Sequence, residues 1–234
     1  MIRNIKNSIL LPGSFFDQLW QDKIDLIIEK INPNTFYFFD HTLNPQNSSY
    51  SVYKQFDAIN KVLEYKTEIR LGTLVTNLKR TSFDEIHDSL NSILSLTNNF
   101  DLGIGIGDSK YEKDSTNNNF NIDESIESIL KKFTFDKECL SIFIGGVSEY
   151  VQSIAVRYDL GMNIWNKDQN YVGKKFKDLG IKNRGRNSFT VHQGLFGAKG
   201  NSLSYCDEII FVIKDSSFDE FTKQLDSIKG WIET

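Results

Sequence analysis

The sequence lacks the features that mark secreted and membrane-spanning chains. It has only 2 cysteines in 234 residues, which excludes a small disulfide scaffold. Cys139 and Cys206 stand beside strand-like residues, and we expect both to be buried thiols in a reducing cytoplasm. No apolar run approaches the roughly 18 residues of a membrane span. The first residues carry a short apolar run and no small-residue cleavage site, so we expect no signal peptide and a cytoplasmic protein.

The sequence also has no large excess of positive or negative charge. The formal net charge is −4 and the pI about 5.5, and basic residues occur at most in pairs such as Lys131 and Lys132. Nucleic-acid-binding domains usually concentrate Lys and Arg on one face, so nucleic acid is disfavoured as a partner. The 3 histidines, His41, His87 and His192, do not cluster in the sequence, and we expect no metal site.

Material for a hydrophobic core is abundant. Apolar residues make up 39% of the chain and aromatic residues 13%, which excludes a disordered or collagen-like chain. The length predicts a single domain over residues 1–234. It fits a doubly wound sheet, and it lies just below the roughly 250 residues of a typical eight-fold β/α barrel.

Apolar periodicity predicts alternating strands and helices. The predicted strands cover residues 8–11, 35–39, 68–75, 100–106, 140–144, 160–165, 189–193 and 209–213. The predicted helices cover residues 14–31, 53–65, 83–96, 123–133, 148–158, 169–179 and 218–228. Near-continuous apolar strands are typical of a parallel sheet buried on both faces. Eight such strands favour an α/β fold of the (β/α)8 barrel type over a doubly wound sheet.

In a β/α barrel the functional site lies at the carboxyl ends of the strands. Asp40 and His41 follow the second predicted strand. A histidine there can exchange a proton near neutral pH, or it can merely cap the loop. Asp108 follows the fourth strand, where it is either an acid and hydrogen-bond acceptor or a solvated loop residue.

Two glycine-containing segments also lie at strand ends. Gly145, Gly146 and Ser148 join a strand to a helix, which suits either phosphate binding at a helix N-terminus or a plain turn with a capping serine. Gly105 and Gly107 belong to an alternating glycine run that lacks the third glycine of a dinucleotide-binding fingerprint. We expect this run to leave room for a flat group at the barrel mouth.

Three of the strand ends, taken in order, resemble the luciferase-like monooxygenase superfamily, a group of barrel enzymes that use flavin or the deazaflavin coenzyme F-420. Residues 36–45 contain Asp-His after the second strand. Residues 68–108 contain Leu-Gly-Thr, Val-Thr and a closing Gly-x-Gly-Asp. Residues 140–165 contain Ile-Gly-Gly-x-Ser and Asp-x-Gly-x-x-x-Trp. Each motif is modest, and their order and spacing carry the resemblance.

The resemblance implies that FMN or coenzyme F-420 lies across the strand ends. His41 would lie near its ring and Asp108 would exchange a proton, so these two are the candidate catalytic residues. The bond between Leu74 and Val75 would be a non-proline cis peptide behind the ring. The implied cofactor-binding residues, from the ring to the phosphate, are Asp40, Leu74, Val75, Thr76, Asn77, Gly105, Gly107, Gly145, Gly146, Ser148 and Trp165.

The leading hypothesis is an oxidoreductase or monooxygenase acting on a small organic substrate. Residues 108–140 and 165–209 are short for the family, which implies a shortened barrel with a reduced lid. A reduced lid shields a reactive oxygenating species poorly, so hydride transfer is favoured over oxygenation. The alternatives are a non-catalytic flavin- or F-420-binding protein and a barrel that acts on a phosphorylated metabolite. Resemblance alone also suggests a homodimer.

Overall fold

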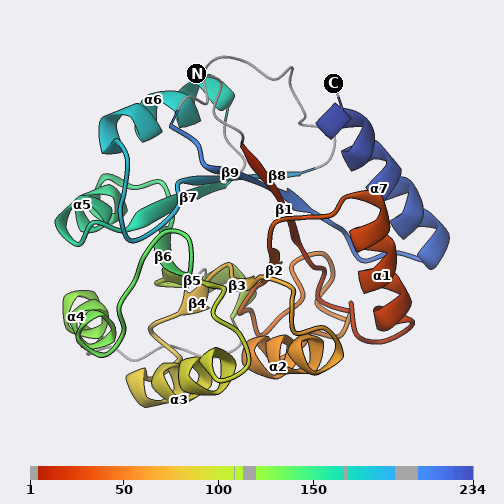
Figure 1. The fold of residues 1–234 in the computed structure, drawn as a ribbon, viewed down its shortest axis with the longest axis horizontal. Coiled ribbons are helices and arrows are strands. Elements are labelled where there is room, and N and C mark those ends of the chain that lie inside the picture. The colour runs from red at the N-terminus through yellow and green to blue at the C-terminus, as the bar shows by residue number, and fades with distance from the viewer. Residues whose placement is uncertain (1–4, 108, 113–119, 166–167, 193–204, 234) are drawn as a thin grey trace.

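A computed structural model describes residues 5–107, 109–112, 120–165, 168–192 and 205–233. Parallel strands form a central barrel, and helices surround it (Figure 1). The strands are β1 (Lys6–Leu10), β2 (Phe36–Phe38), β3 (Leu71–Thr73), β4 (Thr76–Asn77), β5 (Phe100–Gly105), β6 (Leu140–Gly145), β7 (Gly161–Trp165), β8 (Ser188–His192) and β9 (Glu208–Val212). The helices are α1 (Trp20–Lys30), α2 (Gln55–Tyr65), α3 (Phe83–Leu94), α4 (Ile122–Lys132), α5 (Glu149–Arg157), α6 (Gln169–Leu179) and α7 (Phe218–Glu233), with a short 3-10 turn at Ser109–Tyr111.

The pairing of the strands closes the barrel. The order is β3-β2-β1-β9-β8-β7-β6-β5-β4, and β3 also pairs with β5. The third position of the barrel is therefore shared by β3 and β4, which both run parallel to β5. Nine short strands thus fill eight positions, and the predicted (β/α)8 barrel is confirmed. The doubly wound sheet is excluded, because the first strand β1 pairs with the last strand β9.

Capping residues set several helix boundaries. The Ser82 hydroxyl accepts a hydrogen bond from the Glu85 backbone N–H at 3.2 Å, which begins α3 where the sequence predicted. The first helix was predicted to begin at residue 14, which was wrong, because α1 begins only at Trp20. The Ser14 backbone N–H donates to Asp215 Oδ1 at 2.8 Å. Helix α7 passes through Gly230, although the sequence predicted an end before that residue.

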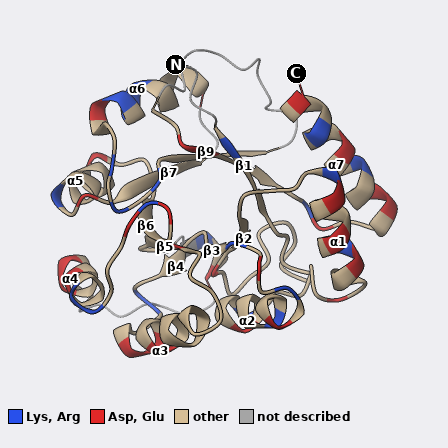
Figure 2. Ribbon diagram, viewed as in Figure 1, with Lys and Arg blue, Asp and Glu red and all other residues tan. Residues whose placement is uncertain are grey.

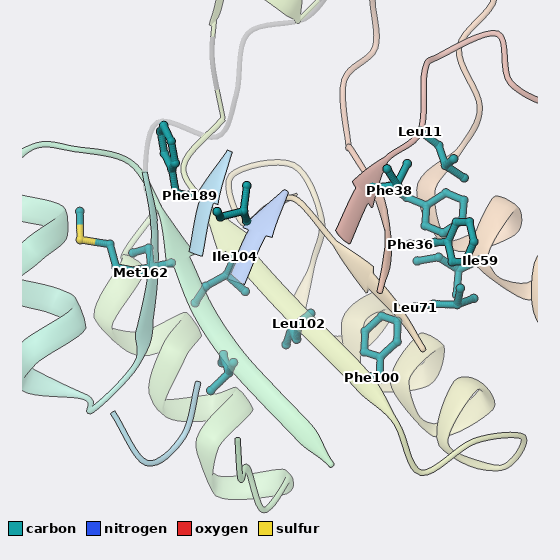
Figure 3. Close-up of a cluster of buried hydrophobic side chains, with 14 of the residues drawn as sticks. Leu11, Phe36, Phe38, Ile59, Leu71, Phe100, Leu102, Ile104, Met162 and Phe189 are labelled. Atoms are coloured by element: carbon teal, nitrogen blue, oxygen red, sulfur yellow. The ribbon is translucent and has the colours of Figure 1, made fainter. Parts of the chain in front are cut away.

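Two apolar layers hold the barrel together. The outer layer lies between the strands and the helices, where Figure 3 shows Phe36 and Phe38 of β2 beside Ile59 of α2. The inner layer fills the barrel and consists of Leu10, Tyr37, Phe39, Leu74, Phe143, Ile210 and Val212. Successive strand residues face opposite sides, so both faces of β2 are apolar because both are buried.

A third, polar layer fills the amino-terminal end of the barrel. We call it the ion cluster: Arg70, Asp101, Arg186, Glu208 and Tyr37. Asp101 is fully buried and accepts six hydrogen bonds, from Thr35, Tyr37, Ser141, Arg186 and twice from Arg70. Burial would raise the pKa of Asp101, but the hydrogen bonds and charges of the two arginines outweigh it and hold the pKa at about 2.

Both signs of charge occur on the helices that surround the barrel (Figure 2). Figure 2 shows acidic and basic residues interspersed over the surrounding helices. Within the described ranges, none of the helices has the length and apolar character needed to cross a membrane. The described residues also contain no group of three or more His, Cys, Asp or Glu side chains that could hold a metal ion. The prediction of two buried thiols is right for Cys206 and wrong for Cys139, which is exposed.

Candidate functional site

The carboxyl ends of the strands bring most of the predicted site residues to one rim. Asp40 and His41 follow β2, Gly145 ends β6 and Trp165 ends β7. Because every pairing is parallel, these ends share one mouth of the barrel, and β2 to β7 are consecutive positions around it. Asp108 lies outside the described residues.

His41 lies between two aromatic rings and faces a buried carboxylate. Its ring centroid is 5.2 Å from that of Phe39 and 5.0 Å from that of Tyr111. Its Nδ1 is 3.6 Å from Oε1 of Glu112, whose side chain is only 6% exposed. At 3.6 Å the two atoms are beyond hydrogen-bond distance, so the carboxylate acts on the imidazole through its charge, and an imidazole in this position is suited to exchange a proton.

Arg80 joins this pair to Asp40. Its guanidinium forms ion pairs with the carboxylates of both Asp40 and Glu112, and its Nη2 also donates to the Asp40 carbonyl oxygen at 2.7 Å. The other carboxylate oxygen of Asp40 accepts a hydrogen bond from the Asn77 backbone N–H at 2.9 Å. Asp40 was predicted to bind cofactor; in the structure its carboxylate holds Arg80 and the Asn77 backbone in place.

Sequence reasoning missed Glu112 and Arg80. Both come from loops, one after β5 and one after β4, and neither belongs to a motif of the three resembling stretches. An acidic residue was expected after β5, at Asp108, and this was the one feature of the sequence that pointed to an acid in this loop. Among the described residues, the carboxylate that faces His41 is Glu112.

The Leu74–Val75 peptide bond is cis, as the resemblance implied. The Val75 side chain lies against two glycines of the neighbouring strands. A Cβ added to Gly105 would lie 2.5 Å from Val75 Cγ2, and one added to Gly145 would lie 2.9 Å from Val75 Cγ1. The run containing Gly105 and Gly107 was expected to leave room for a flat group; in the structure Val75 packs against Gly105, and Asn77 is the neighbour of Gly107.

This packing predicts that a smaller side chain at Val75 reduces the destabilisation caused by a methyl group at Gly105. Gly105→Ala should lower the free energy of unfolding by about 1–3 kcal/mol, because its new methyl group would overlap Val75 Cγ2. In a Val75→Ala background the same change should be much less costly, because the remaining Val75 Cβ is 3.6 Å away. Urea unfolding of the single and double variants measures this coupling.

Gly103→Ala provides the control for that cycle. A Cβ at Gly103 would lie 2.2 Å from the backbone oxygen of Thr73, which trimming Val75 does not move. Equal destabilisation by Gly105→Ala in both backgrounds would contradict the assigned contact.

Thr76 and Asn77 have different surroundings, although both were predicted to bond the ring edge. Thr76 is fully buried, and its hydroxyl donates to Oε1 of Gln55 on α2 at 2.8 Å. Thr76 therefore anchors α2 to the barrel. Asn77 Nδ2 is buried and has no hydrogen-bond partner among the residues that the structure describes, and a Cβ on Gly107 would lie 2.3 Å from it. A ligand acceptor passing over Gly107 would satisfy this donor.

The turn from β6 to α5 is the candidate phosphate site. Gly146 has φ of 137°, which favours glycine, and its N–H donates to the Asn163 carbonyl at 3.1 Å. This N–H therefore bonds to β7 in the structure. The Ser148 hydroxyl caps α5 by accepting from the Val151 N–H at 3.2 Å, which leaves its proton to donate. The first-turn N–H groups of α5 have no partner inside the helix.

Trp165 and His192 form the far side of the mouth. Trp165 is 38% exposed, and its ring meets that of His192 edge-on at 5.3 Å between centroids. Burial, aided by the charge of Lys214, lowers the pKa of His192. This neutral imidazole at the end of β8 adds a second histidine to the same rim as His41.

No protein-family model matches the sequence, and no curated protein matches it. Several solved structures share its fold. The apo form of MsnO8 has a TM-score of 0.71 at 10% identity and covers 98% of both chains. A coenzyme F-420-dependent secondary alcohol dehydrogenase, in complex with an F-420–acetone adduct, has a TM-score of 0.70 at 8% identity and also covers 98% of both chains.

A third match is the oxygenating constituent of 3,6-diketocamphane monooxygenase from Pseudomonas putida, in complex with FMN. Its TM-score is 0.55 at 10% identity, over 79% of this chain and 67% of that one. The fold is thus the α/β barrel, which these F-420- and FMN-binding structures share with the tryptophan synthase alpha chain of Legionella pneumophila, whose TM-score is 0.57 at 8% identity over 99% of this chain and 92% of that one. At these identities the likeness is one of fold.

Proposed function

We propose that this protein is an oxidoreductase that binds FMN or coenzyme F-420 at the carboxyl-terminal mouth of its barrel and acts on a small organic substrate. The observation that carries the proposal is the continuous rim from His41 to Ser148. It combines an imidazole and carboxylate pair, an apolar surface at Val75 and a helix N-terminus with a free hydroxyl proton. The ring face of such a cofactor needs an apolar surface, its phosphate needs hydrogen-bond donors, and a substrate beside the ring needs a group that exchanges a proton.

The residues of the rim fit such a cofactor. Val75 would support the ring face, and the unpaired Asn77 Nδ2 would donate to an acceptor on the ring edge. Ser148 and the first turn of α5 would hold the phosphate, although the acidic Glu149 in that turn reduces the attraction for an anion. When bound, either cofactor supplies hydride transfer.

The ligands of two structural neighbours support the choice of cofactor. One neighbour holds an F-420–acetone adduct and another holds FMN. His41, which faces Glu112, would hold or release the proton of a substrate hydroxyl or carbonyl. Arg80 would fix that carboxylate in place. Proton handling at a substrate oxygen favours dehydrogenation or its reverse over oxygenation.

Titration of the purified protein with FMN and with F-420, followed by absorbance at 420–450 nm, tests the proposal. Saturable binding of one of them is expected. Ser148→Ala should weaken that binding about tenfold, because a charge-assisted hydrogen bond contributes about 1.5–3 kcal/mol.

Ser82→Ala is the matched control for this titration. Ser82 caps α3 with the same 3.2 Å geometry, so both variants lose about 1 kcal/mol of stability, and only Ser148→Ala should lose cofactor affinity. Binding without turnover on any small alcohol or ketone would favour a non-catalytic carrier. Failure of both cofactors to bind would refute the proposal and favour a barrel that acts on a phosphorylated metabolite.

A further inference from the structure

Two cavities open at the end of the barrel opposite the proposed cofactor site. They have volumes of about 440 and about 360 Å³, and both are lined by Lys6, Glu138 and Arg186. Lys6 begins β1, Glu138 precedes β6 and Arg186 precedes β8, so the cavities lie at the amino-terminal ends of the strands. The proposed function makes no use of this end.

The smaller cavity carries an excess of positive charge. Its lining includes four cations, Lys6, Lys137, Lys182 and Arg186, and two anions, Glu138 and Asp207. Lys6 pairs with Glu138 at 3.2 Å, and Lys137 pairs with Asp207 at 2.7 Å. These two pairs account for both anions of the lining and leave Lys182 and Arg186.

Lys182 is a cation of this lining that has no partner among the described residues. It is 7% exposed as a whole residue and makes no ion pair or hydrogen bond with any residue that the structure describes. Its Nζ is not one of the buried atoms that lack a hydrogen-bond partner, so the aliphatic stem is buried while the ammonium reaches solvent. An ammonium without a counterion at the cavity leaves its charge available to an anion that enters from solvent.

Arg186 adds a second partly unsatisfied donor to the same cavity. It is 2% exposed, its Nη1 donates to Asp101 Oδ2 at 3.0 Å, and its Nε has no hydrogen-bond partner among the described residues. Its other acidic neighbour is Glu208, at 3.9 Å. Burial, together with the charge of Asp101, raises the pKa of Glu208.

We infer that the smaller cavity binds a phosphate group between Lys182 and Arg186, either as inorganic phosphate or as the phosphate of a small monoester. Lysine supplies a point charge, and arginine supplies donors in a planar fork that matches an oxyanion. A cavity of about 360 Å³ accommodates a ligand of small-metabolite size. The site is separate from the proposed cofactor phosphate at Ser148, which lies at the other end of the barrel.

Calorimetric titration with inorganic phosphate and with glycerol phosphate, at constant ionic strength, tests this site. Saturable binding of at least one of them at about 1 mM or below is expected. Lys182→Gln should weaken binding at least tenfold, and Lys182→Arg, which keeps the charge, should largely restore it. Tighter binding of the monoester would identify a metabolite, and equal binding would identify free phosphate.

Two controls separate this site from other phosphate contacts. Lys131→Gln removes an exposed lysine on α4, and Ser148→Ala alters the cofactor phosphate site; both should leave affinity within about twofold. If Lys182→Gln fails to fold by circular dichroism, Lys6→Gln, whose side chain is 33% exposed, carries the same expectation of weaker binding. The inference fails if neither ligand saturates, if the lysine variants bind like the wild type, or if Ser148→Ala abolishes binding.

Discussion

Asp101→Asn is expected to lower the free energy of unfolding by about 3–5 kcal/mol, since it breaks a buried ion network by removing one partner. Asp101 is fully buried, and its carboxylate contacts both Arg70 and Arg186, at 2.7 Å and 3.0 Å. An amide would leave Arg70 without its buried carboxylate and would leave Arg186 with Glu208, 3.9 Å away, as its acidic neighbour. Urea unfolding at neutral pH measures the loss, and a change below about 1 kcal/mol would show that the network does not stabilise the barrel.

The pH dependence of stability provides a second test of the ion cluster. The folded pKa of Asp101, about 2, lies below its unfolded value near 3.9. Its contribution is therefore complete above pH 4 and is lost as the pH falls from 4 to 2. In the Asp101→Asn variant, the part of the stability loss between pH 4 and pH 2 that comes from Asp101 should be absent.

Glu208→Gln is the matched neutral control. The pKa of Glu208 is raised, so its stabilising contribution is complete below its unfolded value of about 4.5 and is lost as the pH rises through the folded pKa. A glutamine cannot ionise, so stability at neutral pH should be kept or increased. A loss as large as that of Asp101→Asn would contradict a neutral Glu208.

His41→Ala is expected to reduce turnover by about 10²–10⁴-fold while cofactor affinity changes little, which is the usual effect of removing a general acid or base. This expectation rests on the proposed function and on the 3.6 Å approach of His41 Nδ1 to Glu112. The measurement compares steady-state rates on small secondary alcohols with the cofactor dissociation constant. Equal turnover would leave His41 a structural residue.

Two further variants separate catalysis from structure at this position. Glu112→Gln keeps the shape of the carboxylate but removes its charge, so it should lower turnover less than His41→Ala and shift its pH profile. His87→Ala is the control, because His87 lies on the outer helix α3, where its ring contacts Phe83 and Phe133. Its turnover should match the wild type.

Many of the residues at the mouth of the barrel can be predicted from the amino-acid sequence. Asp40, His41, Gly145 and Trp165 are assigned to it because a parallel barrel places all its strand ends on one rim, and the strands themselves follow from apolar runs. The Ser148 cap is likewise predicted from its place before a helix. The partners of these residues were not predictable. Glu112 meets His41 across 71 positions of sequence, and nothing in either neighbourhood specifies that contact.

The glycines illustrate the difference most clearly. Their spacing at strand ends indicated that another group packs closely against the backbone there, because the space left by a missing Cβ is filled in a packed protein. The identity of the neighbour was decided by the fold. At Gly105 and Gly145 it is Val75, and at Gly103 it is the Thr73 carbonyl and the ring of Phe143.

The sequence by itself determined the elements and their order, because strand and helix formation depends on the periodicity of residues a few positions apart. It also determined where the rim residues stand along each strand. Only the tertiary structure decided the closure of β1 against β9, the assembly of the ion cluster and the pairing of His41 with Glu112. These contacts join residues that are 31 to about 200 positions apart. Their geometry depends on the packing of the whole barrel, so no local pattern encodes them.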